Sequence, residues 1–167
     1  ICISAYNVVC LVETWLDDSV LSSELFPDFF TVFRSDRNKS LTNCSKGGGV
    51  LIAVNAKFSA YSMDMTIFTT VPNVDIVCCK VLCFNRSLII VNLYIPPKIK
   101  SDMFQLFLEI FEQFLSVNKN SIIVGDFNIP HFLEQSLNDM KSRLLRQSMS
   151  FLNLSQVNNI KNCDNRC

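Results

Sequence analysis

Four polar side chains follow short apolar runs of the sequence, at points where chemistry could take place: Glu13, Tyr94, Asp126 and Asn128. Carboxylates are ligands that Mg²⁺ prefers, and the ion is commonly held by one or two of them together with water. A tyrosine hydroxyl and an asparagine amide can donate hydrogen bonds to phosphoryl oxygens. Together these residue types indicate metal-assisted cleavage of a phosphoester, in which the metal stabilises charge on the phosphoryl oxygens and the leaving group.

Taken singly, each of these residues has an ordinary structural explanation. A glutamate after a strand is usually a solvated strand end, and a tyrosine before Pro96 and Pro97 is usually part of packing. Their shared position favours a site, because ligand sites in α/β proteins form at the carboxyl ends of the strands. Core strands held in one sheet would bring the four side chains together.

Six short runs rich in β-branched and other apolar residues predict the strands that carry these groups. Three of them precede the candidate residues: Val8–Val12, Leu88–Leu93 and Ile122–Val124. The other three are Val50–Val54, Val74–Phe84 and Phe29–Phe33.

Two segments have the apolar periodicity of helices that pack on a sheet. The first runs from about Asp102 to Val117, with Ser101 as its expected N-cap. The second is expected at Ser136–Leu152, with these side chains facing inward: Leu137, Met140, Leu144, Leu145 and Phe151. Strands followed by alternating helix and strand predict an α/β fold, in which helices cover the faces of a sheet.

Composition places the chain among single-domain globular proteins. Its 167 residues are 49% hydrophobic and 18% charged, which excludes intrinsic disorder. Charged residues interrupt every apolar run before it reaches the roughly 18 residues of a membrane span, so we expect no membrane association. The formal net charge of zero excludes a polycation that binds nucleic acid non-specifically.

The eight cysteines are interpreted as reduced thiols. No Cys-x-x-Cys spacing occurs and His131 is the only histidine, so a zinc site is not expected. Cys10 and Cys78 lie inside apolar runs, where a free cysteine behaves as a small hydrophobic residue. These features favour a reducing, intracellular compartment and no disulfide-linked partner.

Glycine and charge are both unevenly distributed. Three of the four glycines form the run Gly47–Gly49, which we interpret as a turn leading into a strand, with a phosphate cradle as the alternative. Residues 1–28 contain acidic side chains and no basic one, whereas the charged residues among 34–57 are all basic except Asp36. Arg34 and Arg37 are therefore candidates for contacts with a substrate phosphate. The alternative is an ordinary solvated face.

An ordered set of motifs resembles the endonuclease/exonuclease/phosphatase superfamily. The Glu-Thr-Trp-Leu form of its glutamate motif is the one found in endonuclease domains of non-LTR retrotransposons (long interspersed, jockey-like elements). The matching segments occur in family order: Val9–Leu16, Arg34–Arg37, Gly47–Val54, Tyr94–Pro97, Gly125–Pro130 and Leu154–Asn158.

The resemblance implies a DNase I-like four-layer α/β/β/α sandwich of two mixed sheets flanked by helices. It also implies Mg²⁺-dependent, or Mn²⁺-dependent, nicking of DNA for retrotransposon integration. Glu13 would be the metal ligand, Tyr94 would contact the scissile phosphate, Asp126 would orient or activate the attacking water, and Asn128 would fix the phosphate. Partners would be DNA and a reverse transcriptase domain on the same polyprotein, with action in the nucleus.

Two elements of the family pattern do not occur in the sequence: an active-site Asn upstream of the glutamate motif and a later Ser-Asp-His. We therefore expect residues 1–167 to be one domain truncated at both ends, lacking its first strand and its Ser-Asp-His region. Alone it would be weak or inactive. Two alternatives are a phosphatase or lipid phosphodiesterase of the same superfamily, and a non-catalytic relic or co-opted nucleic-acid-binding module.

Overall fold

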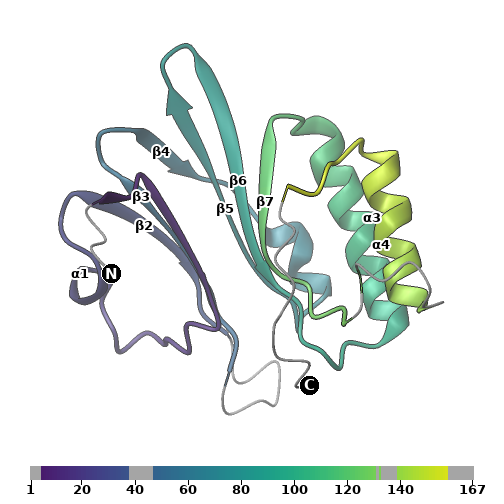
Figure 1. Cartoon of the computed structure of the whole chain (residues 1–167). Coiled ribbons are helices and arrows are strands. Elements are labelled where there is room, and N and C mark those ends of the chain that lie inside the picture. Colours follow the sequence, from purple (N-terminus) through teal and green to yellow (C-terminus); the bar gives the residue numbers. More distant parts are fainter. Residues whose placement is uncertain (1–4, 38–46, 131, 133–138, 158–167) are drawn as a thin grey trace.

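Two β-sheets pack face to face, and helices cover the outer face of the larger one (Figure 1). The computed structural model describes residues 5–37, 47–130, 132 and 139–157. The α/β class and the two packed sheets expected from the sequence are confirmed. No helix in the described part of the chain is long and apolar enough to cross a membrane.

The smaller sheet is antiparallel and has the order β1-β3-β2. Its strands are β1 (Val8–Val12), β3 (Val50–Asn55) and β2 (Phe30–Ser35). The apolar central strand β3 is buried on both faces, which explains why its sequence is continuously apolar rather than alternating. The four-residue helix α1 (Ser22–Leu25) leads into Phe26, which packs on the outer face of this sheet.

The larger sheet has the order β4-β5-β6-β7. Its strands are β4 (Ser59–Ser62), β5 (Asp75–Cys83), β6 (Arg86–Tyr94) and β7 (Ser121–Asp126). β5 and β6 form a long antiparallel hairpin, and β7 runs parallel to β6. The parallel pairing places the last residues of β6 and β7 at the same end of the sheet.

Helices α3 (Ser101–Val117) and α4 (Met140–Phe151) and the 3₁₀ helix η2 (Thr66–Thr70) contribute to a core over the larger sheet. α3 connects the parallel strands β6 and β7. The side chains that α3 buries recur every three or four residues: Phe104, Phe107, Leu108, Phe111, Phe114 and Leu115. The rings of Phe107 and Phe111 stack at a centroid distance of 5.2 Å.

All six predicted strands are present, with ends that differ by at most two residues. The short strand β4 and helix α1 were not predicted, because both are largely exposed and have no apolar periodicity. Ser101 is the first residue of α3 rather than its cap, a position that Lys100 occupies. Leu137 and His131 lie outside the described residues.

The second predicted helix begins later than expected, and two of its side chains face solvent. α4 begins at Met140, because the Asp139 side chain accepts a hydrogen bond from the Ser142 backbone N–H and caps the helix. Leu145 is buried, but Met140 and Phe151 are exposed. These two residues are the first and last of α4, and the helix contacts the core through side chains between them.

Asn92 joins the two sheets through the middle of the structure. It lies on β6, is fully buried, and its side-chain Nδ2 donates to the carbonyl oxygens of Leu11 at 2.8 Å and Leu51 at 2.9 Å. These carbonyls belong to β1 and β3 of the opposite sheet. A buried polar group that is hydrogen-bonded in this way fixes how the two sheets dock.

We predict that Asn92→Ala lowers the free energy of unfolding by about 2–4 kcal/mol, because it removes two buried hydrogen bonds and leaves a cavity. Urea denaturation would measure the change. Asn85→Ala, at the tip of the β5–β6 hairpin, serves as the control and should change stability by less than about 0.5 kcal/mol. Equal stability of the Asn92 variant and the parent would contradict the proposed bridge.

Candidate active site

Glu13 directly follows β1 and is held in place by two hydrogen-bond donors. Its Oε2 accepts from the Gly48 backbone N–H at 3.0 Å and from the Trp15 indole Nε1–H at 2.5 Å. The Tyr94 hydroxyl lies near enough to the carboxylate to lower its pKa. Burial alone would raise the pKa of Glu13. The hydrogen bonds and the positive charge of Arg37 outweigh it and lower the pKa, so the group is a carboxylate at neutral pH.

Tyr94 ends β6 and lies between two acidic neighbours on adjacent strands. Its register partners are Asp75 on β5 and Asp126 on β7. The residue is only 6% exposed. Burial, followed by the hydrogen bond to Glu13 and the Glu13 charge, raises the pKa of Tyr94 from its ordinary 10.0 to about 12. The phenol therefore remains a neutral hydrogen-bond donor throughout the neutral pH range.

This raised pKa gives a spectroscopic prediction for the metal-free protein. The tyrosinate absorbance titration of the protein, minus that of Tyr94→Phe, should isolate one phenol with a pKa of about 12. In Glu13→Gln the same phenol should titrate at lower pH, because a neutral amide no longer disfavours the phenolate. Circular dichroism would establish that the chain is folded during the titration. A Tyr94 pKa at or below 10.0 would contradict the contact with Glu13.

Asp126 and Asn128 form a tight turn at the end of β7. The Asn128 backbone N–H donates to Asp126 Oδ1 at 2.9 Å, and the Asn128 side-chain Nδ2 donates to the carbonyl of Ile95 at 2.9 Å. Asn128 adopts a left-handed conformation with φ 48°, which asparagine tolerates better than most residues. The turn leaves the Asp126 carboxylate exposed and anchors Asn128 to the segment that follows Tyr94.

The run Gly47–Gly49 is irregular backbone that leads directly into β3. Two of its backbone N–H groups donate to protein carboxylates rather than being free for a phosphate: Gly48 donates to Glu13, and Gly49 donates to Asp75 Oδ2 at 3.0 Å. All three glycines have positive φ. A Cβ on Gly48 would lie 2.2 Å from Arg37 Cζ, so the absence of a side chain there lets Arg37 approach the site.

Asp75 is a residue of this cluster that the sequence analysis did not single out. Its side chain is buried, and its Oδ2 lies 2.5 Å from Arg37 Nη2. The Arg37 guanidinium lies over the Tyr94 ring, 5.1 Å from the ring centroid. Asp75 therefore holds a positive charge beside Tyr94 and Glu13. A lone aspartate near the start of a predicted strand is usually solvated, so the sequence offered no signal for this role.

Arg34 occupies a different environment from Arg37. Its guanidinium donates to the carbonyl oxygens of Val20 at 2.6 Å and Asp17 at 2.7 Å, and it pairs with Asp36 at 2.6 Å. These contacts tie the loop before α1 to the end of β2. Nε, Nη1 and Nη2 of Arg34 all donate to protein acceptors.

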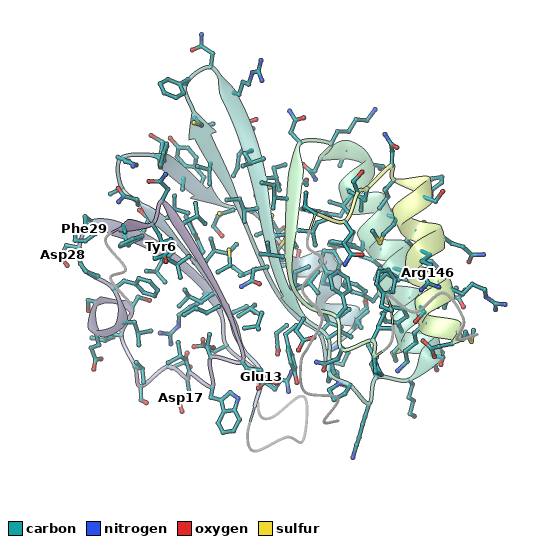
Figure 2. The ribbon with its side chains drawn as sticks, in the orientation of Figure 1. Tyr6, Glu13, Asp17, Asp28, Phe29 and Arg146 are labelled. Carbon is teal, nitrogen blue, oxygen red and sulfur yellow. The ribbon has the colours of Figure 1, made fainter. Side chains whose placement is uncertain are left out.

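Glu13 meets the other candidate residues across the interface between the sheets. The sequence analysis expected the core strands to share one sheet. β1, however, belongs to the smaller sheet and β6 and β7 to the larger one. Figure 2 shows Glu13 at the end of the smaller sheet that faces the larger one. Glu13 and Asp126 nevertheless both lie near enough to Tyr94 to raise the pKa of its hydroxyl.

Glu13 and Asp126 supply carboxylate oxygens, the type of ligand that a divalent cation such as magnesium takes. In the described part of the chain no three His, Cys, Asp or Glu side chains group as a protein cage for a metal would require. Magnesium needs no such cage, since it binds through one or two carboxylates and keeps several waters. The carboxylate of Glu13, which is hydrogen-bonded to the Gly48 N–H, and the exposed carboxylate of Asp126 match that preference.

Comparisons with solved structures agree with this architecture. The endonuclease domain of TRAS1, a telomere-specific non-LTR retrotransposon, superposes with a TM-score of 0.62 and 15% identity, covering 89% of this chain and 61% of that chain. D. rerio TDP2 complexed with single-strand DNA product superposes with a TM-score of 0.52 and 15% identity, covering 93% of this chain and 55% of that chain. The human Nocturnin catalytic domain with bound sulfate superposes with a TM-score of 0.50 and 16% identity, covering 79% of this chain and 57% of that chain.

At these identities the similarities establish the fold. The chain spans 55–61% of the length of these three structures. No curated protein matches the sequence. The sequence model of the Endonuclease/Exonuclease/phosphatase family, however, matches residues 3–162, which is nearly the whole chain. Together with the two packed sheets, this match shows that the chain belongs to the endonuclease/exonuclease/phosphatase family.

Proposed function

We propose that this domain is a Mg²⁺-dependent DNA endonuclease of the non-LTR retrotransposon type, which hydrolyses a phosphodiester of target DNA. The observation that carries the proposal is the group formed by Glu13 of one sheet with Tyr94 and Asp126 of the other. The family includes endonucleases and exonucleases beside phosphatases, and the TRAS1 endonuclease domain shares the fold.

Glu13 is the proposed ligand of Mg²⁺, or of Mn²⁺ in its place. The Gly48 N–H and Trp15 indole N–H fix Oε2, so the carboxylate is oriented before any ligand arrives. The lowered pKa of Glu13 keeps the group ionised. When bound, the metal supplies positive charge that stabilises the phosphoryl oxygens and the leaving group.

Asp126 is the proposed acceptor of a proton from the attacking water. Its carboxylate is exposed, and the Asn128 backbone N–H at Oδ1 fixes its orientation. Asn128 has two side-chain N–H donors, so the contact with Ile95 leaves one for a phosphoryl oxygen.

Tyr94 is the proposed hydrogen-bond donor to the scissile phosphate, to which its single O–H would turn from Glu13, with Arg37 as a nearby positive charge. The phenol cannot act as a base near neutral pH, because its pKa is about 12. Arg37 stacks on the ring and is held there by Asp75, so its charge has a defined place. Arg34 uses its donors on the Asp17–Val20 loop, and we assign it a role in positioning that loop.

The proposal includes DNA as the substrate, a reverse transcriptase domain on the same polyprotein as the partner, and action in the nucleus of the cell. These follow from the ordered motifs that resemble retrotransposon endonucleases. The similarity to a TDP2 structure complexed with single-strand DNA product is in keeping with a nucleic-acid substrate.

A supercoiled-plasmid assay tests this function. Because the chain covers 61% of the TRAS1 domain, the assay uses both the chain and a fusion that adds the remainder of that domain. We expect nicking that requires Mg²⁺, stops with a chelator, and falls about 10²–10³-fold in Glu13→Gln. DNA binding without nicking in either form would favour a non-catalytic binding module. Cleavage of a phosphoinositide instead of DNA would favour a lipid phosphodiesterase.

A further inference from the structure

Trp15 is an exposed aromatic side chain at the edge of the candidate active site. It is the only tryptophan of the chain and is 62% exposed. Among residue types, tryptophan is on average highly buried, because its ring removes a large apolar area from water. Solvent exposure of this ring therefore leaves its stacking surface available to a ligand.

The indole is held in a fixed position although it is exposed. Its Nε1–H donates to Glu13 Oε2 at 2.5 Å, and its backbone N–H donates to the Gly48 carbonyl at 3.0 Å. Trp15 has φ 56°, and Glu13 has φ 55°. A bulky residue in the left-handed region is an uncommon, strained conformation of the kind that gathers at ligand sites. The backbone therefore directs the ring toward Glu13 rather than into the core.

We propose that Trp15 forms a stacking subsite for a nucleobase next to the phosphate that the domain cleaves. This inference rests on the proposed function, since it names how the DNA strand is held at that site. One edge of the indole is used by Glu13, and its flat faces are the surface that a base would cover. Stacking on an aromatic face tolerates all four bases, so the subsite would bind without reading sequence.

The base bound there must be unpaired or unstacked, because bases inside a duplex already cover one another's faces. The ligand is therefore a single-stranded or locally unpaired segment of DNA. Its phosphate would lie toward Glu13 and Tyr94, and the adjacent base would lie over the indole. Arg37, paired with Asp75 beside Tyr94, adds positive charge on the phosphate side.

Because Trp15 is the only tryptophan, its fluorescence reports this contact directly. The chain is titrated, in a chelator, with a short oligothymidylate and with an abasic oligonucleotide of equal length. Fluorescence anisotropy of labelled strands measures binding independently. Both strands should bind, but only the strand with bases should quench Trp15. Trp15→Ala should weaken binding of the strand with bases by about 5- to 100-fold and leave the abasic strand nearly unchanged.

Two further variants separate stacking from the support that Trp15 gives to Glu13. Trp15→Phe keeps an aromatic face but loses the indole N–H, so it should retain most of the affinity that Trp15→Ala loses. The double variant Trp15→Phe/Phe84→Trp moves the indole to the tip of the β5–β6 hairpin, where residue 84 is fully exposed. Quenching by the strand with bases should then disappear.

Equal weakening of both strands in Trp15→Ala would overturn the subsite and leave Trp15 only as a support for Glu13. Binding of both strands without quenching would also overturn it, while leaving the proposed function intact. If neither strand binds any form of the protein, the subsite is overturned, whereas the proposed function is tested separately by the Mg²⁺-dependent nicking assay.

Discussion

Replacing Asp126 with alanine is expected to reduce DNA nicking by about 10²–10⁴-fold, the usual effect of removing a general acid–base group. The carboxylate is exposed, and its described side-chain contact is the Asn128 backbone N–H, so the fold should tolerate the change. Plasmid nicking at saturating Mg²⁺, in whichever form of the domain is active, measures the rate.

Asp28→Ala is the matched control for Asp126→Ala. Asp28 is also an exposed aspartate, and Figure 2 shows it on a different part of the molecule from Glu13. Its nicking rate should remain within about twofold of the parent, since a distant surface charge is largely screened by salt. Nicking by Asp126→Ala at the parental rate would refute the role assigned to Asp126. Loss of nicking in both variants would point to a general loss of folded protein.

Gly125→Ala is expected to lower the free energy of unfolding by about 3–5 kcal/mol, above the usual range for a single substitution. Gly125 has φ 138°, a conformation that is essentially restricted to glycine. A Cβ would lie 1.9 Å from the Leu93 carbonyl oxygen of the paired strand β6. That atom belongs to the backbone of a buried residue, so the strands would have to separate.

Gly47→Ala distinguishes this clash from backbone strain alone. Gly47 also has a positive φ, 90°, but its nearest atom to a new Cβ would be Glu13 Oε2 at 3.5 Å, an ordinary contact. We expect this control to cost about 1–3 kcal/mol, the range for a strained φ without a clash. Guanidinium denaturation measures both variants. Similar losses of unfolding free energy in Gly125→Ala and Gly47→Ala would show that the clash with Leu93 is relieved without cost.

The strands were predictable because each is a short run of apolar, largely β-branched residues. β3 matches the run Val50–Val54 and is buried on both faces, and β1 matches Val8–Val12 although it is only partly buried. The sheet to which each strand belongs was not predictable from these runs, because an apolar strand has the same pattern in either sheet. This is why the sequence analysis expected Glu13 and Asp126 to share a sheet, although they lie on different ones.

The candidate site was predictable where a polar residue interrupts an apolar run, as at Glu13 and Asp126. It was not predictable where the role depends on a distant partner. Asp75 acquires its role from Arg37, which is 38 residues away in the sequence. Arg34 and Arg37 are indistinguishable in the sequence, but the fold directs one to the Asp17–Val20 loop and the other to Tyr94.

The placement of Glu13 and Asp126 on opposite sheets makes the candidate site sensitive to sub-global opening of the domain. A fluctuation that separates the sheets would disrupt the contact of Glu13 with Tyr94, while each sheet kept the backbone hydrogen bonds between its own strands. Amide hydrogen exchange would detect such a state as lost protection at Asn92 and its neighbours. A ligand that bridges both carboxylates would suppress the opening by mass action. If the proposed function holds, heat inactivation would then precede the loss of secondary structure, and substrate would protect the domain against it.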